Sequence, residues 1–316
     1  MAAVSGGIDS SIVALETKPK VIYSGFFNGD EFDETPYSST IAKEINATHY
    51  TYNLTEIDFL KNLEECIEIF CSPIGGLGGV SEYITLKKML KDIPNAKQVL
   101  FGNGGDEIFL GYFFNLYIKE FYDKSKEIPL YMPNFLASKK RISENIIDFM
   151  IISSLNRGTP ATLYSSFVKN IFIPQINTID SIIDKLLFIN INITLPTLLH
   201  VNNQICKSVG VRGFNPLAND DLIKISRYIN TFISDLPKES LRNLYDNLPE
   251  KIRNNRIKKG FPIPVETWHV LNSMMKNAYN SFFKRKKITI EKIPYNGINR
   301  YTWGVFQAEL CFRRFQ

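Results

Sequence analysis

Hydrophobic and polar positions follow two alternating patterns along the first hundred residues. Short runs rich in β-formers predict strands at Val21 to Phe27, His49 to Leu54 and Gln98 to Phe101. Longer segments between them predict helices at Tyr37 to Ala47, Thr55 to Phe70 and Ser81 to Lys91, with Thr55 suited to cap its helix. This order predicts an α/β fold with a doubly wound parallel sheet, whose ligands bind at the carboxyl ends of the strands.

The pattern changes after Tyr122. Strand signals become rare, and helical stretches rich in Ile, Leu and Phe are separated by turns that contain proline. We therefore expect residues 1–122 to form an α/β core and residues 123–316 to form a mainly helical lobe that completes the active site.

The first eleven residues carry the strongest chemical signal. A short apolar run from Met1 meets a loop of small residues, in which Gly6 and Gly7 permit a tight turn directly before a predicted helix. Hydroxyls and backbone N–H groups at a helix N-terminus predict a phosphate cradle, although the Walker pattern is absent. A simple helix cap is the alternative. The carboxylate of Asp9 beside phosphates indicates a divalent metal between them.

A second loop, Gly102 to Glu107, follows the strand that ends at Phe101, and an aromatic helix is predicted from Ile108 to Phe121. Parallel strands place both loops at one edge of the sheet. We therefore expect Asp9 and Asp106 to share magnesium.

Composition narrows the class of protein. The chain of 316 residues is 44% hydrophobic and has a net charge of +5, from 37 basic and 32 acidic residues. Such a mixed surface argues against a nucleic-acid partner, whereas mild basicity suits an anionic ligand. The spacing of the four cysteines and three histidines predicts neither a zinc site nor disulfides. We expect no signal peptide and no membrane span, and hence a cytoplasmic location.

Three later stretches add candidates. Lys238 lies in the first turn of a predicted helix, where the helix dipole disfavours cations, so it is either solvated or paired with an anion. The basic run from Arg253 to Phe261 is either a solvated face or part of a ligand site. The aromatic helix from Tyr301 to Phe315 is expected to pack in the core.

Taken in order, these motifs resemble the synthetase domain of the asparagine synthetase family, whose members include β-lactam synthetases and lasso-peptide cyclases. The matching segments are Ser5 to Ser11, Asp33 to Tyr37, Ser72 to Gly75, Gly102 to Tyr112, Val209 to Leu217, Lys238 to Arg242, Arg256 to Phe261 and Trp303 to Phe315. So many ordered matches are specific, whereas a single motif is not.

The resemblance implies an N-type ATP pyrophosphatase with an adenine nucleotide alpha hydrolase-like core. ATP and magnesium would be used to activate a carboxylate as its adenylate, and an amine would then displace AMP to give an amide. The implied magnesium ligands are Asp9 and Asp106, Lys238 would contact the reacting centre, and Lys258 would neutralise the leaving pyrophosphate. The implied nucleotide-binding residues are Ser5, Gly6, Gly7, Asp9, Ser10, Gly102 and Gly104.

The chain departs from the family on the side of the amine acceptor. Asn103 stands where asparagine synthetases have a glutamate and β-lactam synthetases a tyrosine, and an amide cannot act as a general base. Another group, water or the substrate phosphate must then take the proton. Family carboxylates are also replaced at Cys71, Ser72, Gly210 and Asn219. These changes predict that the ATP half is retained and the acceptor half is remodelled.

The expected partners are a small carboxylate and an amine or ammonia, with the possibility of a homo-oligomer. Ala2 follows Met1 where the family's glutaminase domain opens with a cysteine, so we expect free ammonia, a separate glutaminase or an amine substrate to supply nitrogen. Two other functions stay open. One is adenylation of a base in tRNA, and the other is a nucleotide-binding protein that has lost acceptor chemistry.

Overall fold

A computed structural model describes residues 1–70, 76–112, 115, 174–176, 178–230, 238–255, 262–285 and 294–315. Its centre is a parallel sheet of five strands in the order β3-β2-β1-β4-β5. The strands are β1 (Ala2–Ala3), β2 (Val21–Phe26), β3 (Thr48–Asn53), β4 (Gln98–Leu100) and β5 (Arg212–Phe214). This arrangement confirms the predicted doubly wound α/β fold.

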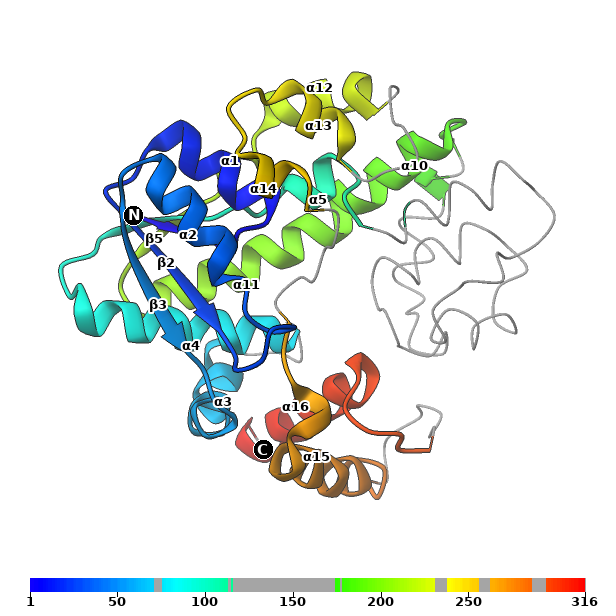
Figure 1. The fold of residues 1–316 in the computed structure, drawn as a ribbon. Helices are drawn as coiled ribbons and strands as arrows, with labels where there is room; N and C mark the ends of the chain where they lie inside the picture. The colour runs from blue at the N-terminus through cyan, green and yellow to red at the C-terminus, as the bar shows by residue number, and fades with distance from the viewer. Residues whose placement is uncertain are drawn as a thin grey trace.

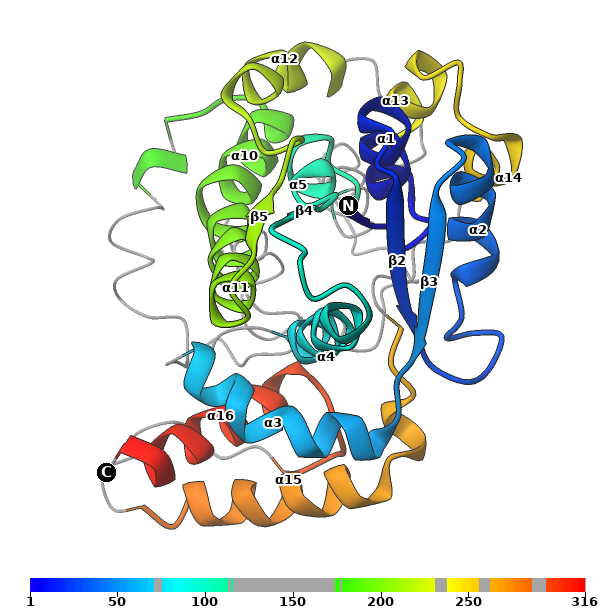
Figure 2. The ribbon, with the colours of Figure 1, turned by 90° about the vertical axis from the view of Figure 1, so that its left-hand side faces the viewer.

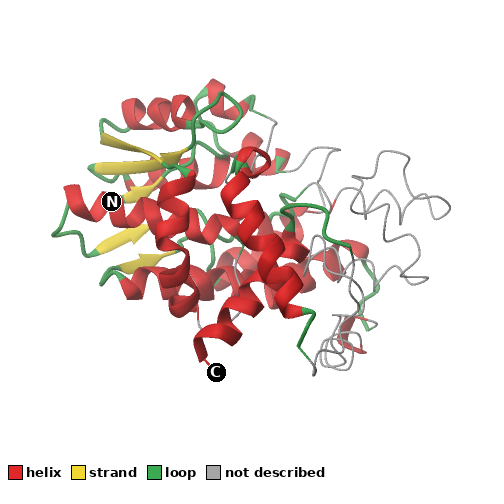
Figure 3. Cartoon of the chain, turned by 90° about the horizontal axis from the view of Figure 1, so that it is seen from below, coloured by secondary structure: helices red, strands yellow, loops and turns green. Residues whose placement is uncertain are grey.

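Helices cover both faces of the sheet (Figures 1 and 2). The helices α1 (Ile8–Thr17) and α2 (Thr35–Glu44) lie on one face, and the other is covered by α4 (Leu77–Asp92) and α11 (Leu195–Ser208). The helix α3 (Glu56–Phe70) packs on the outside of α4 and α11. Seen from below, the strands lie side by side with helices around them (Figure 3).

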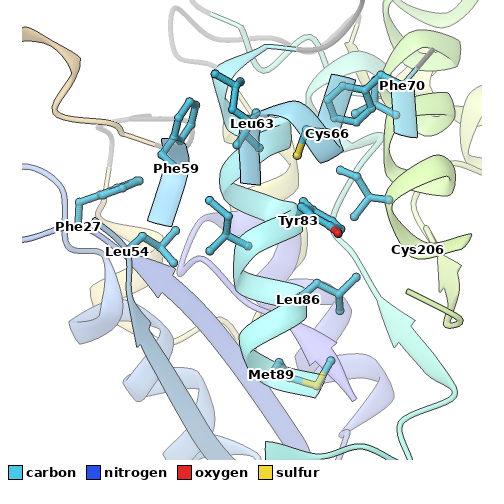
Figure 4. Close-up of a cluster of buried hydrophobic side chains, with 14 of the residues drawn as sticks. Phe27, Leu54, Phe59, Leu63, Cys66, Phe70, Tyr83, Leu86, Met89 and Cys206 are labelled. Atoms are coloured by element: carbon cyan, nitrogen blue, oxygen red, sulfur yellow. The ribbon is translucent and has the colours of Figure 1, made fainter. Parts of the chain in front are cut away.

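Successive side chains of a strand point to opposite faces of the sheet and pack in two separate hydrophobic cores. Ile22 and Tyr23 are neighbours in β2, but Ile22 packs with the α1 and α2 side chains whereas Tyr23 packs with those of α3 and α4. The second core contains large side chains such as Phe59 and Met89, which have no exposed surface (Figure 4). Burial of apolar surface on both faces fixes the sheet between its helices.

The starts of α2 and α3 follow from their local sequence. Before α3, the Asp58 amide donates to Thr55 Oγ1 at 3.1 Å, and the Thr55 amide donates to Asp58 Oδ2 at 3.1 Å. This reciprocal pair confirms Thr55 as a helix cap. The α2 helix starts at Thr35, two residues before the predicted position, because Pro36 favours the first helical turn.

Two further predictions, for α4 and for the helix after the second loop, are wrong. The α4 helix starts at Leu77 instead of Ser81, and it includes Gly79, where a Cβ would lie 3.3 Å from side-chain atoms of Phe70 and Val201. The predicted aromatic helix from Ile108 is instead a short helix, α5 (Gly105–Ile108), followed by a turn. Its continuation is interrupted by Leu110, whose φ of 50° is left-handed. The rest of that predicted helix lies mostly outside the described residues.

The strand β5 was not predicted. It comes from the segment assigned to the helical lobe, yet it pairs along its full length with β4, from Gln98 opposite Arg212 to Leu100 opposite Phe214. The proposed division after Tyr122 stays a prediction, but at least three residues beyond it belong to the central sheet.

A continuous helical segment of 27 residues, Ile182–Ser208, joins α10 (Ile182–Ile189), the π-helical turn η2 (Asn190–Thr194) and α11. Among the described residues it is the one helix long and apolar enough to cross a membrane. Core helices of soluble proteins pass the same test, and α11 packs against α3, α4 and β5. Length and composition alone therefore do not establish a span.

The C-terminal elements pack at opposite ends of the sheet (Figure 1). The helix α14 (Glu250–Arg253) packs on α1 and α2, and α12 (Asp220–Asn230) and α13 (Glu239–Leu244) lie nearby. At the other end, η3 (Val265–Thr267) leads to α15 (His269–Phe282), which packs on α16 (Arg300–Phe315). Trp303 in α16 is buried with its ring 6.0 Å from that of Phe59, which confirms the predicted core role for the first half of this aromatic helix. The prediction is wrong for its end, where Phe312 and Phe315 are exposed.

Candidate functional site

The two glycine-rich loops meet where the order of the sheet reverses. β1 and β4 are neighbours, and the loops that follow them lead into α1 and α5. A Cβ on Gly102 would lie 2.6 Å from the backbone nitrogen of Ser10, so the loops are in direct backbone contact. Crevices at such a reversal are the usual ligand site of doubly wound sheets.

The first loop is built around Gly6 and Gly7. Gly6 has a φ of 86°, and a Cβ there would lie 2.9 Å from the Ser38 amide nitrogen, so a larger residue would strain the turn and collide with α2. The Gly7 amide donates to Ser5 Oγ at 3.2 Å, and the Ser5 and Ser10 hydroxyls lie 3.3 Å apart. These contacts fix the loop at the N-terminus of α1, where an anion is favoured.

Asp9, Asp106, Glu107 and Lys238 form a charged cluster beside this loop. The Lys238 ammonium is ion-paired with Asp9 Oδ2 and lies 2.6 Å from Asp106 Oδ1, with 5% of the lysine side chain exposed. Lys238 is the N-cap of α13 with a φ of 58°, so its predicted place in the first helical turn is wrong. Of the two expected environments, the structure shows the anionic partner.

Burial shapes the acid–base properties of this cluster. Desolvation lowers the pKa of the Lys238 ammonium, while the charge and hydrogen bond of Asp9 act in the opposite direction. Desolvation also raises the pKa of Glu107, which is 1% exposed and accepts a hydrogen bond from the Tyr112 hydroxyl. Glu107 was not among the predicted site residues, although it directly follows Asp106.

Glycines make room for the charged side chains. A Cβ on Gly105 would lie 2.9 Å from the Cβ of Asp9, and a Cβ on Gly111 would lie 2.9 Å from Lys238 Nζ. Gly104, with a φ of 101°, would bring a Cβ to 3.0 Å from the Ala218 amide nitrogen. The second loop therefore needs glycine for close approach as well as for turning.

The carboxylates fit a magnesium ion. Asp9 Oδ1 is buried without a hydrogen-bond partner, and Asp9 and Asp106 both direct an oxygen at the same ammonium. Oxygen ligands suit Mg²⁺, which proteins usually hold by one or two carboxylates together with substrate phosphates. No group of three or more His, Cys, Asp or Glu side chains suited to a metal occurs in the part of the chain described.

Asn103, Asn215, Asn202 and Glu82 form an amide chain that runs away from the charged cluster. Asn103 Nδ2 donates to Asn215 Oδ1 at 2.9 Å, Asn215 Nδ2 donates to Asn202 Oδ1 at 3.1 Å, and Asn202 Nδ2 donates to Glu82 Oε1 at 2.6 Å. Desolvation raises the pKa of Glu82 to about 7. Sequence reasoning missed the last three residues because 120 positions separate Glu82 from Asn202 and no local motif marks either.

The structure thus brings together most of the predicted site residues. Those found in or beside the two contacting loops and the charged cluster are Ser5, Gly6, Gly7, Asp9, Ser10, Gly102, Asn103, Gly104, Asp106 and Lys238. Lys258 lies outside the described residues, as do Cys71 and Ser72. The chemical roles assigned to these residues stay predictions.

Comparison with known proteins gives the family. The pattern of the asparagine synthase family matches residues 2–303. A protein of Methanocaldococcus jannaschii, named putative asparagine synthetase 2 (glutamine-hydrolyzing), is 31% identical over 121 residues, which cover 36% of this chain and 23% of that relative. That family uses ATP for carbon–nitrogen ligation, and its pattern spans both loops and Lys238. The chain therefore belongs to the asparagine synthase family.

Proposed function

We propose that this protein forms an amide bond by activating a carboxylate with ATP as an acyl adenylate, releasing pyrophosphate and then AMP. The observation that carries the proposal is the convergence of Asp9, Asp106 and Lys238 on one point beside the N-terminus of α1. Such a site supplies a phosphate cradle. It also supplies positive charge, from the lysine and from a metal held by the carboxylates, where negative charge develops on the phosphates.

The phosphate chain of ATP would lie on the first loop. The N-terminus of α1 favours negative charge, and the hydroxyls of Ser5 and Ser10 lie beside it. Mg²⁺ would be held by Asp9 and Asp106 and would neutralise charge on the phosphates. Because Asp9 Oδ1 has no hydrogen bond, this oxygen is available as a ligand without breaking one.

Lys238 would stabilise the first chemical step. A substrate carboxylate oxygen attacks the α-phosphorus of ATP, a new P–O bond forms, and the bond to pyrophosphate breaks. Negative charge grows on phosphate oxygens in that transition state, and a buried ammonium at hydrogen-bonding distance lowers its free energy. The left-handed backbone of Lys238, costing of order 1 kcal/mol, indicates that its position is determined by the surrounding packing.

The second step joins nitrogen to the activated carbonyl. An amine attacks, the C–N bond forms, AMP leaves with the electron pair of the C–O bond, and the amine loses a proton. Asn103 is an amide and does not accept this proton at neutral pH. A phosphate oxygen of the departing AMP is a base generated within the reaction, and we assign it the proton.

Exchange of labelled pyrophosphate into ATP tests the first step without any amine. We expect exchange that depends on Mg²⁺ and on one acid from a panel of amino acids and other small carboxylates. Asp106→Asn should reduce it by about 10²- to 10³-fold through loss of charge complementarity. The control is Asp221→Asn, the same change at a side chain that is 88% exposed.

The outcome of the exchange experiment separates this function from its competitors. Absence of exchange across the acid panel, with folded protein that still binds ATP, contradicts adenylation and favours a nucleotide-binding protein without acceptor chemistry. Full exchange in Asp106→Asn would instead leave adenylation in place and contradict the metal site.

A further inference from the structure

We propose that Glu82 is a positioning residue that acts through Asn202 and Asn215 to hold the amide of Asn103 with its carbonyl oxygen directed at the amine substrate. The inference rests on the proposed function, since it concerns the nitrogen-donor step. In this role Asn103 determines specificity, because its carbonyl oxygen accepts a hydrogen bond only from a substrate nitrogen that carries a hydrogen.

The location of Asn103 places it at the reacting site. Its neighbour Gly102 packs on the Ser10 backbone, and Gly105 packs on the Asp9 side chain. Asn103 therefore lies on the loop that contacts both the phosphate cradle and the charged cluster. One branch of its side chain, Nδ2, donates to Asn215, while Oδ1 has no hydrogen-bond partner among the described residues.

The direction of the amide chain is determined at its Glu82 end. An ionised carboxylate only accepts hydrogen bonds, so Asn202 must turn Nδ2 toward Glu82 and Oδ1 toward Asn215. Asn215 must then donate to Asn202, and its Oδ1 is left to accept from Asn103. Each amide sets the orientation of the next, and the last one, Asn103, is left with a carbonyl oxygen that accepts no hydrogen bond within the described residues.

The surroundings of Glu82 keep other charges from reversing this direction. Within the described part of the chain, the titratable groups that face it are Tyr23 of β2 and Cys206 of α11, and burial raises the pKa of both, which keeps them neutral. Gly213 of β5 leaves the space for the chain, because a Cβ there would lie 2.8 Å from Cys206 Sγ and 3.2 Å from Asn202 Oδ1. Asn202 is 2% exposed, so water does not compete for its amide.

Protonation of Glu82 is the event that releases the orientation. A neutral carboxyl group can donate as well as accept, and the amides can then reverse together. Burial raises the pKa of Glu82 to about 7, so the carboxylate imposes the direction above neutral pH and loses control below it. Binding of the amine should weaken accordingly as the pH falls through 7.

The kinetic test uses Glu82→Gln, whose amide imposes no direction on the chain. We expect the KM for the amine to rise by about 3- to 10-fold at pH 8, the value of one net hydrogen bond, and to lose its pH dependence near 7. Pyrophosphate exchange, which needs no amine, should be unchanged. The matched control is Glu64→Gln, the same change at an exposed position of α3.

A second variant interrupts the chain without touching Glu82. Asn215→Leu should raise the KM for the amine to the same extent, and the double variant Glu82→Gln/Asn215→Leu should show no further increase, because both changes break one chain. Additive effects, or an unchanged amine KM and pH profile in both variants, would overturn the inference while exchange in the same proteins still supports the proposed function.

A neutron structure of the wild-type protein at pH 8 tests the orientation even if no exchange is found. Deuterons on Asn103 Nδ2 directed at Asn215, and on Asn202 Nδ2 directed at Glu82, support the inference. The reverse orientation overturns it. Failure of the proposed function therefore shows in the exchange experiment, and failure of this inference shows in the amide directions.

Discussion

The charged cluster and the amide chain are two ways of fixing polar side chains beside the same loop. In the cluster, Asp9, Asp106 and Lys238 hold one another by opposite charge, and the position of each depends on the others. In the chain, Asn103, Asn215 and Asn202 are neutral, and one carboxylate at the far end determines their direction. Charged groups are therefore concentrated where the phosphates of ATP are expected. On the side of the amine, the orientation of neutral amides is expected to determine binding.

The largest expected effect comes from removing the cation of the charged cluster. Lys238→Met leaves two carboxylates facing one another in a nearly buried site, and we expect a loss of about 3 to 5 kcal/mol in the free energy of unfolding. Because Mg²⁺ can replace the ammonium, added Mg²⁺ should restore part of this stability, as measured by urea denaturation. Equal stability of both proteins in chelator would contradict the role of this ion pair.

Gly102→Ala tests the contact on which both systems depend. A methyl group 2.6 Å from a backbone nitrogen cannot be accommodated by side-chain rotation, so we expect a loss of about 1 to 3 kcal/mol in the free energy of unfolding. The control is Gly304→Ala in the middle of α16, where a Cβ meets no atom within 4 Å. At that position the higher helix propensity of alanine predicts an increase of about 0.5 to 1 kcal/mol in the free energy of unfolding.

The variant Glu82→Gln tests the amide chain separately from the charged cluster, through the pH dependence of the free energy of unfolding. The pKa of Glu82 is raised in the folded protein, to about 7 from an ordinary 4.5, so folding binds protons between these values. The free energy of unfolding should therefore fall as the pH rises through this window, by about 2 kcal/mol between pH 5 and 8 relative to the variant. Parallel curves for the two proteins would show that Glu82 titrates normally.

The smallest effect is expected for an exposed ion pair, which shows how little a solvated charge contributes to the free energy of unfolding. Lys224 and Asp221 form an ion pair at 3.4 Å with side chains 75% and 88% exposed. We expect Lys224→Ala to change the free energy of unfolding by less than about 0.5 kcal/mol. A larger change would mean that charge alone, without burial, matters in this protein, and it would weaken the contrast with Lys238.

Local sequence was sufficient to predict most of the α/β core. The β-rich run at Val21 and the cap at Thr55 carry information within a few residues, and the structure confirms both elements. β5 could not be found this way because Arg212-Gly213-Phe214 lacks β-branched residues and is stabilised by pairing with β4. A helix was wrongly continued past Ile108 because the aromatic run gives no sign that Leu110 turns left-handed.

The site was predictable where a motif recurs and not where contacts are remote. Asp9 and Asp106 each follow a glycine-rich turn after a strand, so the geometry of a parallel sheet predicts that they meet. Lys238 could only be expected to need an anion, because 229 residues separate it from Asp9. Glu82 looks like any charged residue of a helix, and its relation to Asn103 depends on two intervening amides.

The separation of Asp9 from Lys238 also has a consequence for synthesis of the protein. At roughly 5 to 20 residues per second, the ribosome adds Lys238 tens of seconds after Asp9. A nascent chain can pair β1 to β4 in that interval, but β5 and the lysine arrive later. Until then the two aspartates of the growing chain are left without their ammonium, and a solvent cation is the partner available to them.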